Sequence, residues 1–151
     1  MYVHKSLEVE SVDIGNYCKE KDLEACAIKL NFISTHICII AIYRAPTGNF
    51  NFFISNLDSI LRNLYNPTLE LIICGDINID YLKNTDKNQL ENLLLSYNLT
   101  STVNIPTRCY KHSAMAIDNV FIDINRKNDC ILNPVMNGLS DHDAQLITLK
   151  K

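Results

Sequence analysis

The sequence has no uncharged apolar run of about 18 residues or more, the length that a membrane-spanning helix requires. Its longest apolar stretch, Ile37–Tyr43, is only long enough for a β-strand. The residues that follow Met1 also lack the pattern of a signal peptide. We therefore expect a soluble intracellular protein, cytoplasmic or nuclear, that has no membrane partner.

Cysteine pairs with the C-x-x-C spacing are missing as well, although the chain contains six cysteines. Disulfides and a zinc site are the alternatives to free thiols for such a set. Cys26, Cys38 and Cys74 lie in apolar runs that resemble strands. We interpret all six as free thiols, and these three as small hydrophobic core residues.

An excess of positive charge is also absent, because 14 Lys and Arg residues face 17 Asp and Glu residues. This balance argues against a chain whose main role is non-specific binding of phosphate backbones. It leaves open an enzyme that meets phosphates through a bound cation. Repeats, low-complexity tracts and linkers are not found, and 151 residues with 47% hydrophobic content predict one domain, 1–151, with a packed core.

The spacing of apolar residues predicts a mixture of strands and helices. Cys26–Phe32 alternates as a half-buried strand does, and Ile37–Tyr43 is expected to pair with it in a hairpin. Apolar residues three and four apart predict a helix over Phe50–Leu64, which the following Asn-Pro pair stops. We expect further elements at Met1–His4, Leu7–Val12, Leu69–Cys74, Leu90–Tyr97 (a helix), Leu99–Val103, Ala116–Ile122, Cys130–Val135 and Gln145–Leu149. This order favours an α/β or α+β fold with helices covering stacked sheets.

Two polar side chains follow the strand Leu69–Cys74 and Gly75, at positions 76 and 78. Residues two apart on an extended backbone point the same way, so Asp76 and Asn78 can address one target together. One interpretation is that they hold a nucleophile or a phosphate oxygen. The other is an ordinary turn, because Gly, Asp and Asn all favour turns.

Ionisable residues also cluster near the C-terminal strand, in the segment Ser140-Asp141-His142-Asp143. Buried strands do not normally begin with three ionisable groups, and Gly138 supplies flexibility for a loop. The segment is either a plain polar loop or a functional one. In the functional interpretation Asp141 binds a hard cation through oxygen, and His142 contacts a phosphate or donates a proton.

Asp118 shares a strand face with Val120 and Ile122 by alternation. A carboxylate on an apolar face is costly unless it is paired. We expect His142 to be the partner, because an acid that orients an imidazole is a recurring catalytic arrangement. The alternative is that this face is solvated.

Tyr43 ends an apolar strand, and Pro46 fixes the loop after it. The side chain is either a packing tyrosine with a solvated hydroxyl or a phenol that hydrogen-bonds an anion. Each of these signals is weak alone. Together they give a tyrosine, an Asp/Asn pair, a single Asp and an Asp-His pair in that order, all near strand ends.

This ordered set resembles the endonuclease/exonuclease/phosphatase superfamily, and more closely the endonuclease domain of non-LTR retrotransposons. The resemblance implies a four-layered α/β sandwich, in which two packed, mostly antiparallel sheets are flanked by helices. It further implies hydrolysis of phosphodiesters that depends on Mg²⁺, or on Mn²⁺, with DNA as the substrate. The matching segments are Tyr43-Arg44-Ala45-Pro46, Gly75-Asp76-Ile77-Asn78, Pro106-Thr107-Arg108, Ile117-Asp118-Asn119-Val120-Phe121 and Ser140-Asp141-His142.

The same resemblance implies roles for individual residues. Asp76 matches the aspartate that orients or deprotonates the attacking water, and Asn78 matches an asparagine that binds the substrate. His142 matches the histidine at the scissile phosphate, and Asp118 matches its orienting acid. Tyr43 matches a tyrosine that contacts phosphate. Asp141 is the residue that matches the metal site.

Members of this superfamily begin with a strand and a helix that carry an asparagine and a metal-binding glutamate. The resemblance implies that this chain is an N-terminally truncated copy that starts after both. An inactive remnant, acting at most as a binding fragment, is therefore the alternative function. A sheet that began upstream would leave an open edge, through which copies of the chain are expected to self-associate. Met115 and Ile77 depart from the family pattern, which has a small hydroxyl residue and Phe at these places.

Overall fold

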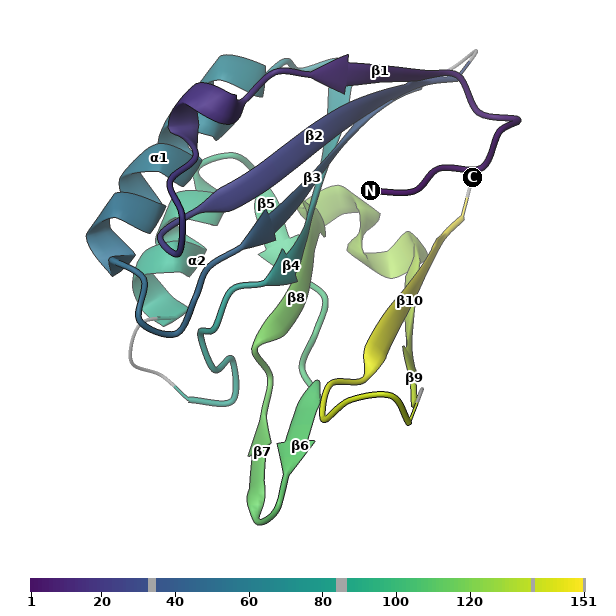
Figure 1. The fold of residues 1–151 in the computed structure, drawn as a ribbon. Coiled ribbons are helices and arrows are strands. Elements are labelled where there is room, and N and C mark those ends of the chain that lie inside the picture. Colours follow the sequence, from purple (N-terminus) through teal and green to yellow (C-terminus); the bar gives the residue numbers. More distant parts are fainter. Residues whose placement is uncertain (33–34, 84–86, 137, 151) are drawn as a thin grey trace. The chain divides into compact units, whose positions relative to one another are not determined.

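The computed structural model describes residues 1–32, 35–83, 87–136 and 138–150 and shows a mixed α/β fold (Figure 1). The chain divides into two compact units, Met1–Ile77 and Asn78–Lys151. In the described part of the chain, none of the helices is both long and apolar enough to cross a membrane.

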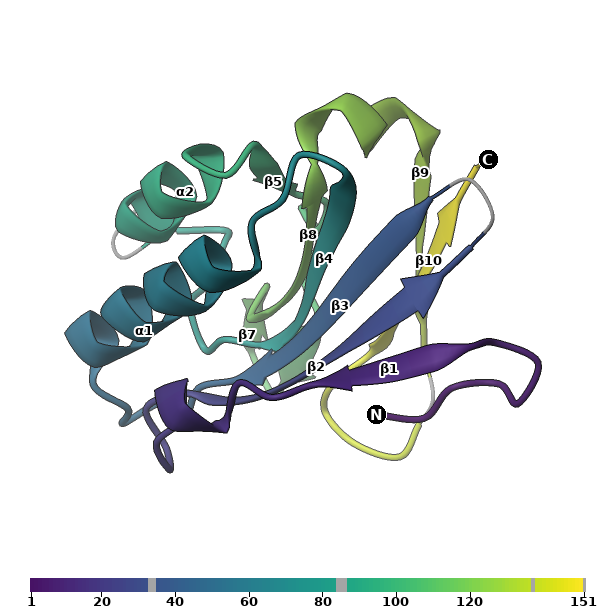
Figure 2. The ribbon, with the colours of Figure 1, turned by 90° about the horizontal axis from the view of Figure 1, so that it is seen from above.

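The first unit is a sheet in the order β1-β2-β3-β4 with a helix, α1, along one face (Figures 1 and 2). β1, β2 and β3 pair in antiparallel fashion, whereas β3 and β4 are parallel. A parallel pair needs a crossover connection, and α1 supplies it. The elements are β1 (Val9–Val12), a 3₁₀ turn (Gly15–Tyr17), β2 (Glu24–Asn31), β3 (His36–Tyr43), α1 (Phe50–Leu64) and β4 (Leu69–Asp76).

Helix α1 confirms the range predicted from periodicity. Asn49 caps its first turn, because the Asn49 side chain accepts a 2.9 Å hydrogen bond from the Phe52 N–H. The helix buries one apolar stripe, as its spacing predicted. The buried residues are Phe53, Leu57, Ile60, Leu61 and Leu64.

The expected inward face of the strand predicted over Cys26–Phe32 is wrong at Cys26, which is exposed. Phe32, which is also exposed, lies beyond the end of β2. The register explains Cys26. Ala27 pairs with the fully buried Ile40, so Ala27 lies on the core face, and alternation turns Cys26 to the opposite face. Cys38 is buried as expected, and Cys74 is half-buried.

The N-terminal segment also differs from expectation, because Met1–His4 forms no strand. Pairing with β2 begins only at Val9. The first residues instead line a pocket of about 320 Å³ over the sheet, together with Leu7, Ile28 and Ile39.

Among its described residues, the second unit contains three antiparallel pairs, β5 with β8, β6 with β7, and β9 with β10. α2 packs on β5, and its buried residues Leu90 and Leu94 contribute to a core with Leu99 and Phe121. The β6–β7 hairpin was missed, because strands of three residues are too short to show alternation. The elements are α2 (Lys87–Leu95), β5 (Leu99–Ser101), β6 (Arg108–Tyr110), β7 (Ser113–Met115), β8 (Asp118–Asp123), a 3₁₀ helix (Ile124–Asp129), β9 (Cys130–Val135) and β10 (Ala144–Leu149).

Candidate functional site

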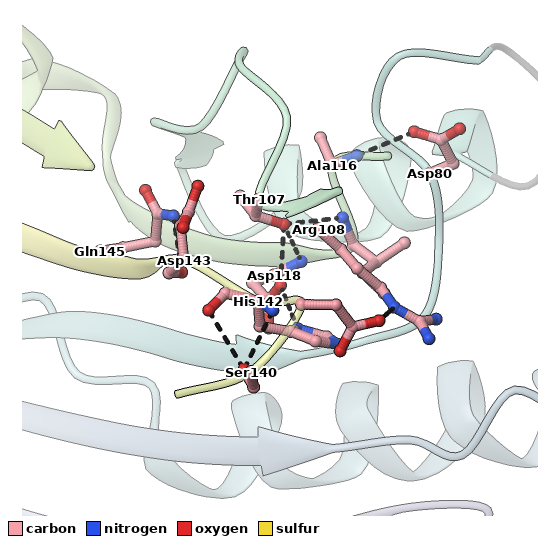
Figure 3. A network of polar contacts seen from close by, with 11 residues as sticks. Asp80, Thr107, Arg108, Ala116, Asp118, Ser140, His142, Asp143 and Gln145 are labelled. Atoms are coloured by element: carbon pink, nitrogen blue, oxygen red, sulfur yellow. Dashed lines mark hydrogen bonds and ion pairs between the residues drawn. The ribbon is translucent and has the colours of Figure 1, made fainter. Parts of the chain in front are cut away.

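An acid and an imidazole are paired in the second unit, as the sequence predicted (Figure 3). The Nδ1 atom of His142 lies 2.9 Å from Oδ2 of Asp118. Both side chains are half-buried, at 30% and 21% exposure. Asp118 is the first residue of β8, and His142 forms a bridge with Arg108 at the start of β6. A carboxylate can only accept, so Nδ1 carries the proton and Nε2 is left as the second functional atom of the ring.

Thr107 provides a second hydrogen bond to the Asp118 carboxylate. Its hydroxyl donates a 2.7 Å hydrogen bond to the same Oδ2 atom that faces His142. The hydroxyl oxygen also accepts the backbone N–H groups of Ile117 and Asp118, at 3.1 and 3.0 Å. Thr107 is completely buried. One side chain therefore fixes both the backbone and the carboxylate of Asp118.

Asp80 anchors the residues just before β8 (Figure 3). Its Oδ1 atom accepts the N–H groups of Ala116 at 3.0 Å and Leu82 at 3.1 Å, while the Tyr81 N–H donates to the Ala116 carbonyl. Burial alone would raise the pKa of Asp80. The hydrogen bonds from Ala116 and Leu82 and the Lys83 ammonium outweigh burial and lower that pKa. Asp80 is therefore ionised at neutral pH and holds the chain that leads into Asp118.

Asp141 forms an ion pair with Arg108, whose Nε lies 2.7 Å from Oδ2 of the carboxylate. The hydrogen bond from Arg108 lowers the pKa of Asp141, so the carboxyl is ionised at neutral pH. Backbone hydrogen bonds tie the same loop down. The Cys109 N–H donates to the Asp141 carbonyl, and the Asp143 N–H donates to the Thr107 carbonyl. His142 is therefore carried by a loop that is fixed on both sides.

Tyr43 and Asp76 come together in the first unit. They are Cα partners at the ends of the parallel strands β3 and β4. The Tyr43 side chain is 40% exposed, and Asp76 is half-buried. The preceding Gly75 has φ +148°, and a Cβ there would lie 1.8 Å from the Ile42 carbonyl oxygen, so only glycine fits.

Asn78 does not continue the strand, because β4 ends at Asp76 and Asn78 has φ +49°. The assumption of an extended backbone from Asp76 to Asn78 is therefore wrong. Asparagine is one of the few residues that adopt this left-handed conformation readily.

Sequence reasoning missed three residues of this arrangement, namely Asp80, Thr107 and Arg108. Thr107 and Arg108 lie in a recognised motif, but no pattern indicated their partners, Asp118 and Asp141. A threonine between Pro and Arg has no periodic signal. Its burial among backbone N–H groups is visible only in the structure.

A sequence model of the endonuclease-reverse transcriptase family matches residues 37–146, which is more than half of the chain. The chain belongs to this family. It lies within the endonuclease/exonuclease/phosphatase superfamily, as the ordered motifs predicted. The matched range contains all six predicted site residues. A search of the curated proteins found no match.

Solved structures share the fold of this family member at low sequence identity. The endonuclease domain of TRAS1, a telomere-specific non-LTR retrotransposon, has a TM-score of 0.78 and 14% identity over 98% of this chain and 71% of its own. An AP endonuclease from Archaeoglobus fulgidus has a TM-score of 0.62 and 13% identity over 83% of this chain and 65% of its own. The 3′ phosphatase NExo from Neisseria, bound to a product DNA hairpin, has a TM-score of 0.61 and 12% identity over 83% and 65%. The chain thus spans less than two thirds of the last two proteins.

Proposed function

We propose that this chain is a metal-dependent phosphodiesterase of endonuclease type, which nicks DNA by attack of water on a phosphodiester. The observation that carries the proposal is the Thr107–Asp118–His142 arrangement, with 2.7 and 2.9 Å hydrogen bonds to one carboxylate oxygen. An ordered imidazole of this kind suits a reaction in which negative charge grows on phosphate oxygens.

His142 has a defined part in this reaction. Asp118 accepts from Nδ1–H and stabilises the positive charge that the ring acquires when it is protonated. The Nε2–H of the protonated ring then donates to a phosphate oxygen of the substrate. Thr107 contributes by keeping the Asp118 carboxylate in place.

The roles of the remaining residues are proposals that rest on family membership. Asp76 orients or deprotonates the attacking water, and Asn78 binds the substrate beside it. Tyr43, which is the register partner of Asp76, donates its phenol hydrogen to a phosphate oxygen.

The donor chemistry of the site fits a hard divalent cation, for which we propose Mg²⁺, with Mn²⁺ as a substitute. Within the second unit, Asp118 and Asp141 offer carboxylate oxygens and His142 offers an imidazole nitrogen. Oδ2 of Asp118 already accepts two hydrogen bonds, which suits the orienting role, and we assign the metal to Asp141, as the family resemblance implies. A bound cation would neutralise charge on the phosphate oxygens.

We also propose that the two units act as one functional domain, with the four-layered arrangement that the family resemblance implies. β1 has β2 as its one sheet neighbour among the described strands. An edge strand offers unpaired backbone groups to a second chain, so we propose that copies of the chain self-associate there. Sedimentation of the purified protein as a monomer at all concentrations would contradict this.

Nicking of supercoiled plasmid tests the function directly. Purified protein is incubated with plasmid and Mg²⁺, with and without a chelator. We expect nicking that the chelator abolishes, and a loss on the order of 10²- to 10⁴-fold in Asp76→Asn and in His142→Gln.

Two matched variants control this assay. Asp143→Asn removes a carboxylate next to His142 that has no assigned role, and His36→Gln removes an exposed histidine whose ring contacts Asn31. Both should nick at the wild-type rate. Absence of chelator-sensitive nicking in the wild-type protein would overturn the proposal, and DNA binding without nicking would favour the inactive remnant.

A further inference from the structure

Arg44 is a buried guanidinium in the first unit. It directly follows β3, and only 5% of its surface is exposed. Its Nε donates a 3.0 Å hydrogen bond to the Ile77 carbonyl, and its Nη1 donates a 2.9 Å hydrogen bond to the Gly48 carbonyl. Its backbone N–H donates to the Asp76 carbonyl at 3.0 Å. Arg44 therefore holds two consecutive peptide carbonyls, those of Asp76 and Ile77.

Aromatic rings complete the surroundings of this guanidinium. The Arg44 Cζ atom lies 5.8 Å from the ring centroids of both Phe50 and Phe53, in the first turn of α1. A buried charge is costly unless its donors are bonded, and here carbonyl oxygens and ring faces take that role. The guanidinium thus connects the end of β4 to the start of α1.

The segment that Arg44 holds is the end of β4 and the residue after it, where the backbone has unusual dihedral angles. Gly75 has φ +148° and lacks a side chain, and Asn78 has φ +49°. Between these two residues lies Asp76, the carboxylate that is proposed to orient or deprotonate the attacking water. A fork-shaped guanidinium can fix the Ile77 carbonyl and the Gly48 carbonyl at the same time, whereas the single ammonium of lysine cannot reproduce that geometry.

We propose that Arg44 is a positioning residue for Asp76. The Arg44 guanidinium fixes the backbone turn from Gly75 to Ile77 against the N-terminus of α1. The part of this inference that concerns catalysis rests on the proposed function. The part that concerns the turn stands on the hydrogen bonds alone.

Arg44→Lys and Arg44→Ala test the inference, with Arg62→Lys as the matched control on the exposed face of α1, where Arg62 pairs with Asp58. We expect kcat for plasmid nicking to fall by about 10- to 100-fold in both Arg44 variants, because small misplacements of catalytic groups have effects of this size. KM should change by less than about threefold, since substrate binding is not removed. Millimolar guanidinium should restore part of the rate in Arg44→Ala, whereas urea should not.

An NMR measurement separates this inference from the proposed function. Residual dipolar couplings of the Ile77–Asn78 peptide should shrink in both Arg44 variants and stay unchanged in Arg62→Lys. If the wild-type protein does not nick DNA, the proposed function fails, and these couplings still decide on Arg44. Unchanged couplings in both Arg44 variants would overturn the inference, whether or not their melting temperatures fall.

Discussion

The Thr107 hydroxyl donates to the Asp118 oxygen that also faces His142, at 2.7 Å and 2.9 Å respectively. Two donors therefore share a single acceptor atom. The Thr107 oxygen in turn accepts the N–H of Asp118 itself, so hydroxyl, backbone and carboxylate form a closed local ring. The position of the imidazole thus depends on a threonine whose hydroxyl bonds the Asp118 carboxylate and two backbone N–H groups.

Thr107→Val should destabilise the fold and release His142, whereas Thr107→Ser should do neither. Valine keeps the shape of threonine but leaves the N–H groups of Ile117 and Asp118 without their acceptor, at a cost of about 2–4 kcal/mol. Urea unfolding measures this loss. Nitrogen NMR shifts of the His142 ring should show the Nδ1–H tautomer in the wild type and a mixture in Thr107→Val. An unmixed Nδ1–H tautomer in Thr107→Val would contradict the role given to the hydroxyl.

Gly75→Ala should disrupt the first unit, and Gly138→Ala should not. Both glycines have positive φ, +148° and +65°, so each substitution costs about 1–3 kcal/mol of backbone strain. At Gly75 the new Cβ also meets the Ile42 carbonyl oxygen at 1.8 Å, whereas at Gly138 no atom lies within 4 Å. We expect Gly75→Ala to have the much lower melting temperature, measured by circular dichroism. Equal melting temperatures in the two variants would show that the close approach to the Ile42 carbonyl oxygen does not affect stability.

Acid should remove the stabilisation that Asp141 and Asp80 provide. The hydrogen bond from Arg108 lowers the pKa of Asp141, and for Asp80 the backbone hydrogen bonds outweigh burial and lower the pKa. A carboxyl whose pKa is lower in the folded state stabilises the fold above its unfolded pKa of about 3.9 and stops doing so as the pH falls through the folded value. The urea concentration at the midpoint of unfolding should therefore fall as the pH is lowered below about 4. This fall should be smaller in Asp80→Asn and in Asp141→Asn. Parallel curves for the three proteins would contradict this.

The cysteines should react with iodoacetamide at two distinct rates. Burial raises the pKa of Cys38 and of Cys74, so at pH 8 few of their thiols are ionised, and Cys38 is also inaccessible. Cys26 and Cys109 are exposed and should be alkylated first. Mass spectrometry of timed samples gives the order. Rapid labelling of Cys38 in the native protein would show that β3 opens locally.

Much of the fold follows from patterns that are complete within a short stretch of sequence. The range of α1 could be predicted because its apolar spacing and its following proline both lie in view. The pairing of Asp118 with His142 could be predicted from cost, since an acid on an apolar face needs a partner and few candidates exist.

Other features could not be predicted because they depend on distant packing. Either face of β2 could be the inner one from its sequence, and the pairing of Ala27 with the buried Ile40 decides against Cys26. The contact from Arg44 to Ile77 joins residues that are 33 positions apart. A sequence pattern does not show where a long polar side chain reaches over such a separation.

The parallel pairing of β3 with β4 has a consequence for the order in which parts of the first unit fold. Because α1 intervenes, Arg44 can meet Ile77 only after a connection of 33 positions has closed. Closing a long loop costs entropy before any contact is gained, so local pairs such as the β2–β3 hairpin form earlier on the folding path. We therefore expect the surroundings of Asp76 to become ordered later in folding than the β2–β3 hairpin.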